Sequence, residues 1–199
     1  MDRKLLAWGL RGKPGRLPRL WLFTDERRLP DPRRSVAALP RGRAGVVLRH
    51  DRDGARATLG HDLARICRER RLILVVAGDV RLAARLHAGV HLRGGLWPNP
   101  LRRRAVVTSS AHSIQQVRRA LTAGASLVFL SPAFATASHA GASGLGALRW
   151  SAMAQRARIG VRTRGAGVAA LGGIDGRSVT RLPKSLFQAV GAIGGLSIG

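Results

Sequence analysis

The stretch Leu72-Ile-Leu-Val-Val-Ala77 is apolar at every position and lacks the alternation that marks a strand with one face in water. A run of this kind is typical of a strand that is buried on both faces of a parallel sheet. Helical patterns lie on either side of it. Leu59, Leu63 and Ile66 share one helical face before it, and residues 80–86 repeat apolar side chains with the same period after it. The stretch therefore predicts a buried parallel strand between two covering helices.

The same alternation of strand and helix patterns recurs along the chain. Helical patterns at 113–123, where Ser113 is a suitable N-cap, and at 145–157 lie between apolar runs. Eight strands alternating with helices in one short domain predict an α/β fold of the (β/α)8 TIM-barrel class. An open doubly wound sheet is the alternative, although no Gly-x-Gly-x-x-Gly motif follows the first strand. Besides 72–77, the strand candidates are residues 20–24, 44–49, 89–92, 105–108, 127–130, 167–171 and 189–193.

The first and last connections are the least defined part of this fold. We expect residues 1–19 to form an N-terminal extension and residues 20–199 to form a single barrel domain. The last predicted strand is followed by only a few residues, so the eighth helix is expected to be short or missing. Either residues 1–19 or a partner would then cover that side of the barrel, and a homo-oligomer is among the alternatives.

The composition fits one domain with a sizeable core, since 45% of the 199 residues are hydrophobic. No apolar run approaches the roughly 20 residues that a membrane span needs. The basic start has no small-residue cleavage site, which argues against a signal peptide but leaves a transit role open. The one cysteine, Cys67, lies in a helical pattern and suits a buried core thiol. We therefore expect a cytoplasmic protein that does not bind a membrane.

The formal net charge of +25 invites a nucleic-acid interpretation. Lysine occurs only at Lys4, Lys13 and Lys184, so nearly all of the positive charge is arginine, a bias that a GC-rich coding sequence produces without selection for a partner. The arginines are dispersed, and the absence of tyrosine and scarcity of phenylalanine leave little surface for stacking bases. Nucleic-acid binding is therefore the less favoured interpretation, whereas a small anionic ligand needs only a few arginines.

Candidate site residues follow the predicted strands, because barrel ligands bind at the carboxyl ends of the strands. Glycines after the last two strands would point backbone N–H groups at an anion, as in the usual barrel phosphate site. Four of the six histidines lie near strand ends, but no carboxylate or cysteine stands at ligand spacing beside them, so we expect no histidine metal site. The candidate binding residues are Arg49, Ser110, Thr136, Ser138, Gly172, Gly173 and Gly195, and the candidates for proton transfer are His112 and His139.

The type and order of these residues resemble those of thiamine phosphate synthases and TenI-type proteins from about Leu20 onward. The resemblance implies a (β/α)8 barrel that handles thiazole or pyrimidine phosphates in thiamine biosynthesis. In the synthases, magnesium and basic residues hold a pyrimidine diphosphate, pyrophosphate leaves, and the thiazole nitrogen attacks the exposed methylene. The motifs that carry the resemblance are Thr24-Asp25, Arg49, Gly89-Val-His-Leu92, Ser110-Ala-His112, Ser131-Pro-Ala-Phe-Ala-Thr136, Gly144-Leu-Gly146 and Leu171-Gly-Gly-Ile174.

The chain departs from the family pattern at the diphosphate clamp. The family's Asn-Asp pair after the third strand reads Ala77-Gly78 here, with Asp79 one place late, and its next acidic residue reads Leu96. Both usual magnesium carboxylates are thus absent, although magnesium itself stays open as a cofactor. The glutamine that precedes Arg49 in the family is Val47, and the two family lysines are Asp51 and His139. The histidine that TenI-type tautomerases place before the Phe-x-Thr segment is Pro132.

The leading hypothesis is a divergent member of this group that binds a thiazole phosphate or a related phosphorylated heterocycle. Arg49 would supply charge, Ser110, Thr136 and Ser138 would supply hydroxyl groups, and the glycines would supply N–H donors to phosphate. The alternative is a non-catalytic sensor or regulator that kept the phosphate site and lost the magnesium site. An arginine-rich nucleic-acid binder is the third interpretation.

Overall fold

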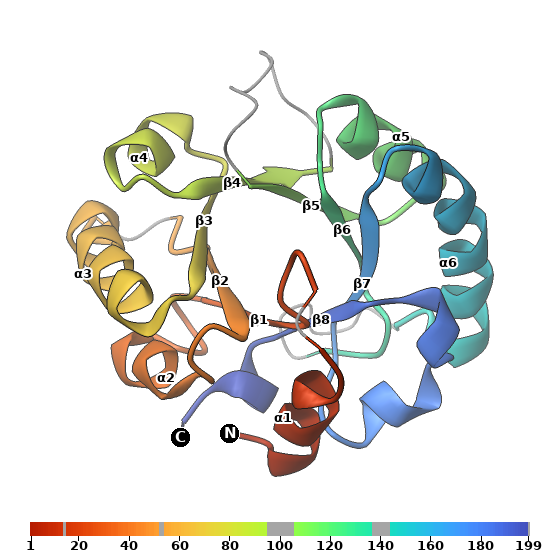
Figure 1. Cartoon of the computed structure of the whole chain (residues 1–199), viewed down its shortest axis with the longest axis horizontal. Helices are drawn as coiled ribbons and strands as arrows, with labels where there is room; N and C mark the ends of the chain where they lie inside the picture. The colour runs from red at the N-terminus through yellow and green to blue at the C-terminus, as the bar shows by residue number, and fades with distance from the viewer. Residues whose placement is uncertain (14, 52–53, 95–105, 137–143, 199) are drawn as a thin grey trace.

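Eight parallel strands close into a barrel in chain order in the computed structural model, which describes residues 1–13, 15–51, 54–94, 106–136 and 144–198 (Figure 1). The first strand pairs in parallel with both the second and the eighth. This pairing confirms the barrel and excludes the open sheet. The strands are β1 (Leu20–Phe23), β2 (Ala44–Leu48), β3 (Ile73–Ala77), β4 (Gly89–Arg93), β5 (Val107–Ala111), β6 (Leu127–Leu130), β7 (Gly167–Leu171) and β8 (Ala189–Ala192).

Helices surround the barrel, and most of those in the described residues follow the predicted pattern (Figure 1). The Ser113 hydroxyl accepts a hydrogen bond from the N–H of Gln116 at 3.3 Å, which confirms the predicted N-cap. The helix predicted at 145–157 runs further, to Thr163. Two helices were not predicted, one before β1 and one between β1 and β2. The helices are α1 (Arg3–Leu10), α2 (Arg33–Ala38), α3 (Arg56–Arg70), α4 (Val80–Arg85), α5 (Ile114–Thr122) and α6 (Gly146–Thr163).

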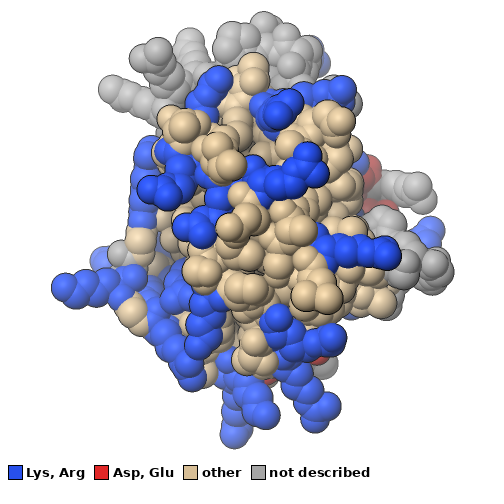
Figure 2. All heavy atoms as spheres, turned by 90° about the vertical axis from the view of Figure 1, so that its right-hand side faces the viewer, with Lys and Arg blue, Asp and Glu red and all other residues tan. Residues whose placement is uncertain are grey.

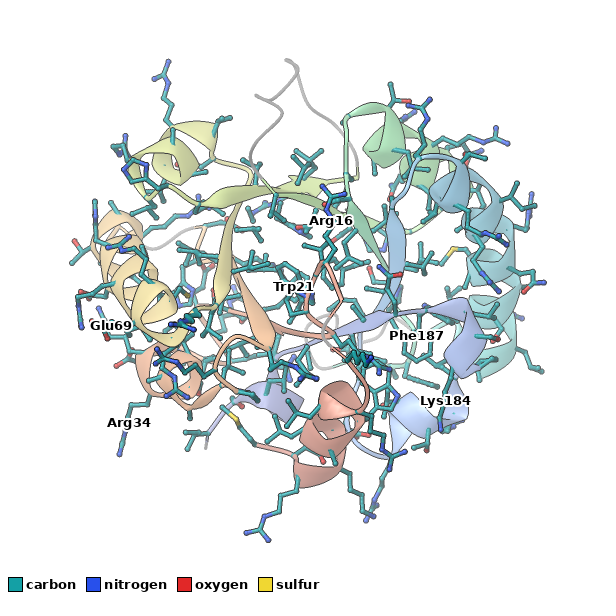
Figure 3. All side chains as sticks on the ribbon, in the orientation of Figure 1. Arg16, Trp21, Arg34, Glu69, Lys184 and Phe187 are labelled. Carbon is teal, nitrogen blue, oxygen red and sulfur yellow. The ribbon has the colours of Figure 1, made fainter. Side chains whose placement is uncertain are left out.

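Aromatic side chains fill the barrel interior. Trp21 and Phe23 of β1 both contact Phe129 of β6, a strand on another side of the barrel, so all three point inward. Figure 3 shows Trp21 inside the ring of strands. Two glycines in the neighbouring strands make room for them. A β-carbon at Gly45 of β2 would overlap the Trp21 ring, and one at Gly191 of β8 would lie 2.6 Å from Phe23. Large residues opposite glycines thus pack the narrow interior without a central channel.

The side of the barrel next to β8 is covered by short 3-10 helices and by α1. η2 (Ser178–Arg181) and η3 (Lys184–Leu186) connect β7 to β8, and η4 (Gly194–Leu196) follows β8. Asp2 joins α1 to this region, since its N–H donates to the carbonyl of Gly195 and its carboxylate accepts from the N–H of Gly176. Trp8 of α1 stacks on Phe187 with ring centroids 5.4 Å apart. Of the two alternatives for this side, the structure shows the N-terminal segment.

None of the helices in the described ranges is both long enough and apolar enough to cross a membrane.

Candidate functional site

The described candidate residues lie at one end of the barrel, because all eight strands are parallel and each candidate lies near the end of a strand or after it. The fifth strand begins later than expected, so Ser110 lies within β5 and not after it. Ser138 and His139 fall outside the described residues. The others are Arg49 after β2, His112 after β5, Thr136 after β6, Gly172 and Gly173 after β7, and Gly195 after β8.

A buried hydrogen-bond chain fixes the backbone at the ends of β1 and β2. The N–H of Arg49 donates to the Thr24 hydroxyl at 2.9 Å, and that hydroxyl lies 3.0 Å from Nδ1 of His50. Nε2 of His50 lies 3.2 Å from the carbonyl of Pro30, which only accepts, so Nε2 carries the proton and Nδ1 accepts from Thr24. His50 is therefore a structural residue that holds Arg49 at the rim.

His91 of β4 is a core histidine. Its Nδ1 lies 2.8 Å from the Thr108 hydroxyl and its Nε2 lies 2.8 Å from the Ser110 hydroxyl. Burial, together with the positive charges of Arg49 and Arg93, lowers the pKa of His91 to about 3. His91 is thus neutral at pH 7, and it contacts the hydroxyl of Ser110 that we predicted for the ligand.

His112 is differently placed, at the exposed rim after β5. Its Nδ1 lies 2.8 Å from the carbonyl of Ser131, so Nδ1 carries the proton and donates it to that carbonyl. Nε2 of the neutral ring then holds the lone pair. The backbone N–H of His112 donates to the Gln116 side chain at 2.7 Å, which fixes the ring at the start of α5. An imidazole held in one tautomer with an available lone pair is suited to accept a proton.

Gly172 and Gly173 lie directly beneath the segment that follows β6. Both have positive φ, 94° and 62°, which side chains rarely adopt. The N–H of Phe134 donates to the carbonyl of Gly172 at 3.0 Å, and a β-carbon on Gly173 would lie 2.5 Å from the carbonyl oxygen of Ala135. The two loops are therefore packed backbone to backbone, and only glycine fits between them.

The backbone after β8 brings in a cation that the sequence interpretation missed. A β-carbon at Gly194 would lie 3.6 Å from Nη2 of Arg28, which belongs to the turn after β1. The Asp25 carboxylate closes that turn by accepting from the N–H groups of Arg27 and Arg28. Gly195 itself has a packing role, because a β-carbon there would lie 2.9 Å from Leu5 of α1. The pairing of β1 with β8 explains why Arg28 could not be found from spacing alone.

The described residues do not fit a magnesium clamp. Asp51 pairs with Arg93 at the end of β4 and with Arg56 at 3.4 Å, so arginines already neutralise its carboxylate. Asp79 accepts from the N–H of Leu82 at 2.8 Å as the N-cap of α4. Within the described ranges, no three acidic, histidine or cysteine side chains group together as metal ligands. The family's next acidic position, Leu96, lies outside these ranges.

Two comparisons with known sequences find relatives of this chain. The family model described as thiamine monophosphate synthase matches residues 20–196. A thiamine-phosphate synthase of Chromobacterium violaceum is 36% identical over 152 residues, which cover 72% of this chain and 69% of that protein.

Solved structures show the same fold. A thiamine phosphate pyrophosphorylase from Pyrococcus furiosus superposes with a TM-score of 0.69 at 22% identity, covering 88% of this chain and 85% of that one. A thiamine phosphate pyrophosphorylase from Bacteroides thetaiotaomicron gives a TM-score of 0.58 at 18% identity, covering 90% and 84%. At these identities the superpositions show the fold alone.

Proposed function

Because this chain belongs to the thiamine monophosphate synthase family, we propose that the carboxyl end of its barrel binds a thiazole phosphate or a related phosphorylated heterocycle of thiamine biosynthesis. The observation that carries this proposal is the pair of glycine turns after β7 and β8. Among the described residues, no loop hydrogen bond uses the N–H groups of Gly172, Gly173, Gly194 or Gly195. Main-chain N–H groups of this kind are suited to bind phosphate oxygens.

The side chains near these glycine turns suit a ligand that carries a phosphate on a heterocyclic ring. Arg28 lies beside Gly194 and would add a positive charge next to the phosphate. Arg49 at the end of β2 and the hydroxyls of Thr136 and Ser138 would contact the rest of the ligand. If the ligand is converted, His112 is the residue whose Nε2 would accept a proton, with His139 as the second candidate. Conversion that survives in a His112→Ala/His139→Ala double variant would remove both from the mechanism.

The contacts that Asp51 and Asp79 make with protein groups help to decide between the candidate functions. Asp51 and Asp79 are engaged by protein groups, so the residues described at this end supply no pair for a magnesium diphosphate. The favoured function is therefore binding of the monophosphate, with altered or lost synthase chemistry. A sensor or regulator on the same fold is the second candidate. The cytoplasmic location of this protein remains a prediction.

A calorimetric titration with thiazole phosphate tests the site. Gly173→Ala is expected to weaken binding at least about tenfold, because its β-carbon would displace the segment at Ala135 from the phosphate site. Gly124→Ala is the matched control, since Gly124 also has a positive φ, 84°, but a β-carbon there meets no other atom within 4 Å. Equal affinities in the two variants would contradict the placement of the phosphate.

Incubation with both thiamine precursors and magnesium, followed by mass spectrometry, separates enzyme from sensor. Thiamine phosphate formed at a rate that depends on His112 would identify an active synthase. Binding of thiazole phosphate with no product would identify the sensor. Absence of both binding and product would refute the proposed function.

A further inference from the structure

A cavity lies at the amino-terminal end of the barrel, opposite the glycine turns. The segment between α1 and β1 crosses the ring of strands in Figure 1, and the cavity beneath it has a volume of about 220 Å³. Ala44 and Ile73, at the starts of β2 and β3, form part of its wall, which places it far along the strands from the glycine turns after β7 and β8. Figure 3 shows Arg16 over this end of the barrel. The cavity is separate from the proposed thiazole phosphate site.

The wall of this cavity carries positive charge without compensation. Five of its residues are cationic, and none of the residues that line it is acidic; the cationic ones are Lys13, Arg16, Arg19, Arg43 and Arg71. Burial lowers the pKa of Arg19, and the charge of Arg43 beside it adds to that lowering. Like charges in a partly enclosed space repel each other, so a bound anion would stabilise this group of side chains.

Two of the guanidinium groups are held in fixed positions. Nη2 of Arg43 donates to the carbonyls of Leu10 and Gly12 at 3.0 and 3.2 Å, and Nη1 of Arg19 donates to the carbonyl of Arg11 at 2.9 Å. The Arg19 guanidinium also lies over the Trp8 ring, 4.3 Å from its centroid. These contacts use only some of the N–H groups of each guanidinium. The Nε of Arg19 is buried and has no hydrogen-bond partner in the described part of the chain.

We propose that this cavity is a second binding site, for a small phosphate-class anion of about the size of a diphosphate. Its volume is below the roughly 300–1,000 Å³ of pockets for drug-sized ligands, which favours a compact anion over a nucleotide. Arginine forks bind phosphate oxygens through paired N–H groups, and the fixed guanidinium groups of Arg19 and Arg43 lower the entropic cost of binding. The exposed side chains of Arg16 and Arg71 would contact the anion from outside.

Calorimetric titration with inorganic pyrophosphate, in EDTA and at low salt, tests this site. The test variant is Arg16→Gln/Arg71→Asn. Both side chains are exposed, and asparagine tolerates the left-handed backbone of Arg71, whose φ is 54°. We expect the wild-type protein to bind pyrophosphate and this variant to bind it at least about tenfold more weakly, because two charged contacts are lost. Circular dichroism melting of both proteins checks that the fold is retained.

The matched control is Arg34→Gln/Arg118→Gln, which removes the same charge from two exposed arginines on α2 and α5. It is expected to keep wild-type affinity within about twofold. Equal weakening in both double variants would show binding to net charge alone and overturn the proposal. Loss of all pyrophosphate binding in Gly173→Ala would also overturn it, since that result places the anion at the other end of the barrel. A wild-type protein that binds no pyrophosphate refutes it directly.

Discussion

At the scale of single residues, His91 makes the clearest prediction. Its pKa is lowered from 6.5 to about 3 in the folded protein, so the unfolded chain binds more protons than the folded one between these values. The free energy of unfolding therefore falls as the pH drops below 6.5, with a contribution from His91 of up to about 1.4 kcal/mol per pH unit. We expect His91→Gln to show a shallower pH dependence than the wild type in urea unfolding from pH 7 to pH 4.

The exposed His61 provides the control for this measurement. His61→Gln removes a histidine from the surface of α3 and is expected to keep the wild-type slope. Slopes that are the same in the wild type and in His91→Gln would contradict a neutral His91 in the core.

Residue by residue, the sequence was most informative where local pattern decides the environment. Cys67 was predicted as a core thiol because its helix places it among apolar residues; it is buried, and burial raises its pKa to about 12. Asp51 shows the limit. Its arginine partner Arg93 ends β4, two strands away, so the order and register of the neighbouring strands bring the two residues together. Ser110 was predicted for the ligand, and the structure adds a contact between its hydroxyl and His91 of the neighbouring strand β4.

At the scale of elements, α1 is expected to contribute substantially to stability. Leu5 is fully buried and contacts the backbone at Gly195, whereas Leu10 on the same helix is 40% exposed. Leu5→Ala is expected to lower the free energy of unfolding by about 2–5 kcal/mol through loss of apolar contact and the cavity left behind. Leu10→Ala is expected to stay within about 0.5 kcal/mol of the wild type. Urea unfolding of the two variants measures the difference, and equal losses would show that α1 does not pack on the barrel.

The elements that the sequence pattern predicted differ in length and burial from the elements that it missed. Strands such as β3 were visible because burial on both faces demands an uninterrupted apolar run. α2 has only six residues and no capping side chain, so its sequence carries no helix signal. α1 contains Gly9, a poor helix former whose missing side chain leaves space for Leu20 of β1. A local signal was present in Asp2, whose carboxylate caps α1 by accepting from the N–H groups of Lys4 and Leu5, and tertiary contact supplies the rest.

At the scale of the whole molecule, the acidic residues are unevenly distributed along the sequence. The sequence has no aspartate or glutamate between Asp79 and Asp175. Figure 2 shows the side of α5 and α6, where lysine and arginine side chains are spread over the surface between uncharged residues. Dispersed cations of this kind support weak association with any polyanion.

We therefore expect random duplex DNA to bind only at low salt, with an affinity that falls steeply as salt rises and no preference for sequence. Fluorescence anisotropy over a salt series measures this. Micromolar binding that persists at about 150 mM salt would instead support nucleic acid as the partner.

Closure of the barrel was predictable because eight runs of strand length alternate with helical patterns, and the parallel order then places the described candidate residues at one end. The chemistry at that end was predictable only in part. The glycines after β7 and β8 are visible in the sequence by themselves, whereas Arg28 lies beside Gly194 only because β8 pairs with β1.

The central claim is that main-chain amides after β7 and β8 hold a phosphate. A ¹⁵N–¹H NMR titration with thiazole phosphate in EDTA measures those amides directly. We expect the largest shifts at the N–H groups of Gly172, Gly173, Gly194 and Gly195, saturating together. Saturable binding that leaves these four amides unchanged while other residues shift would contradict the account.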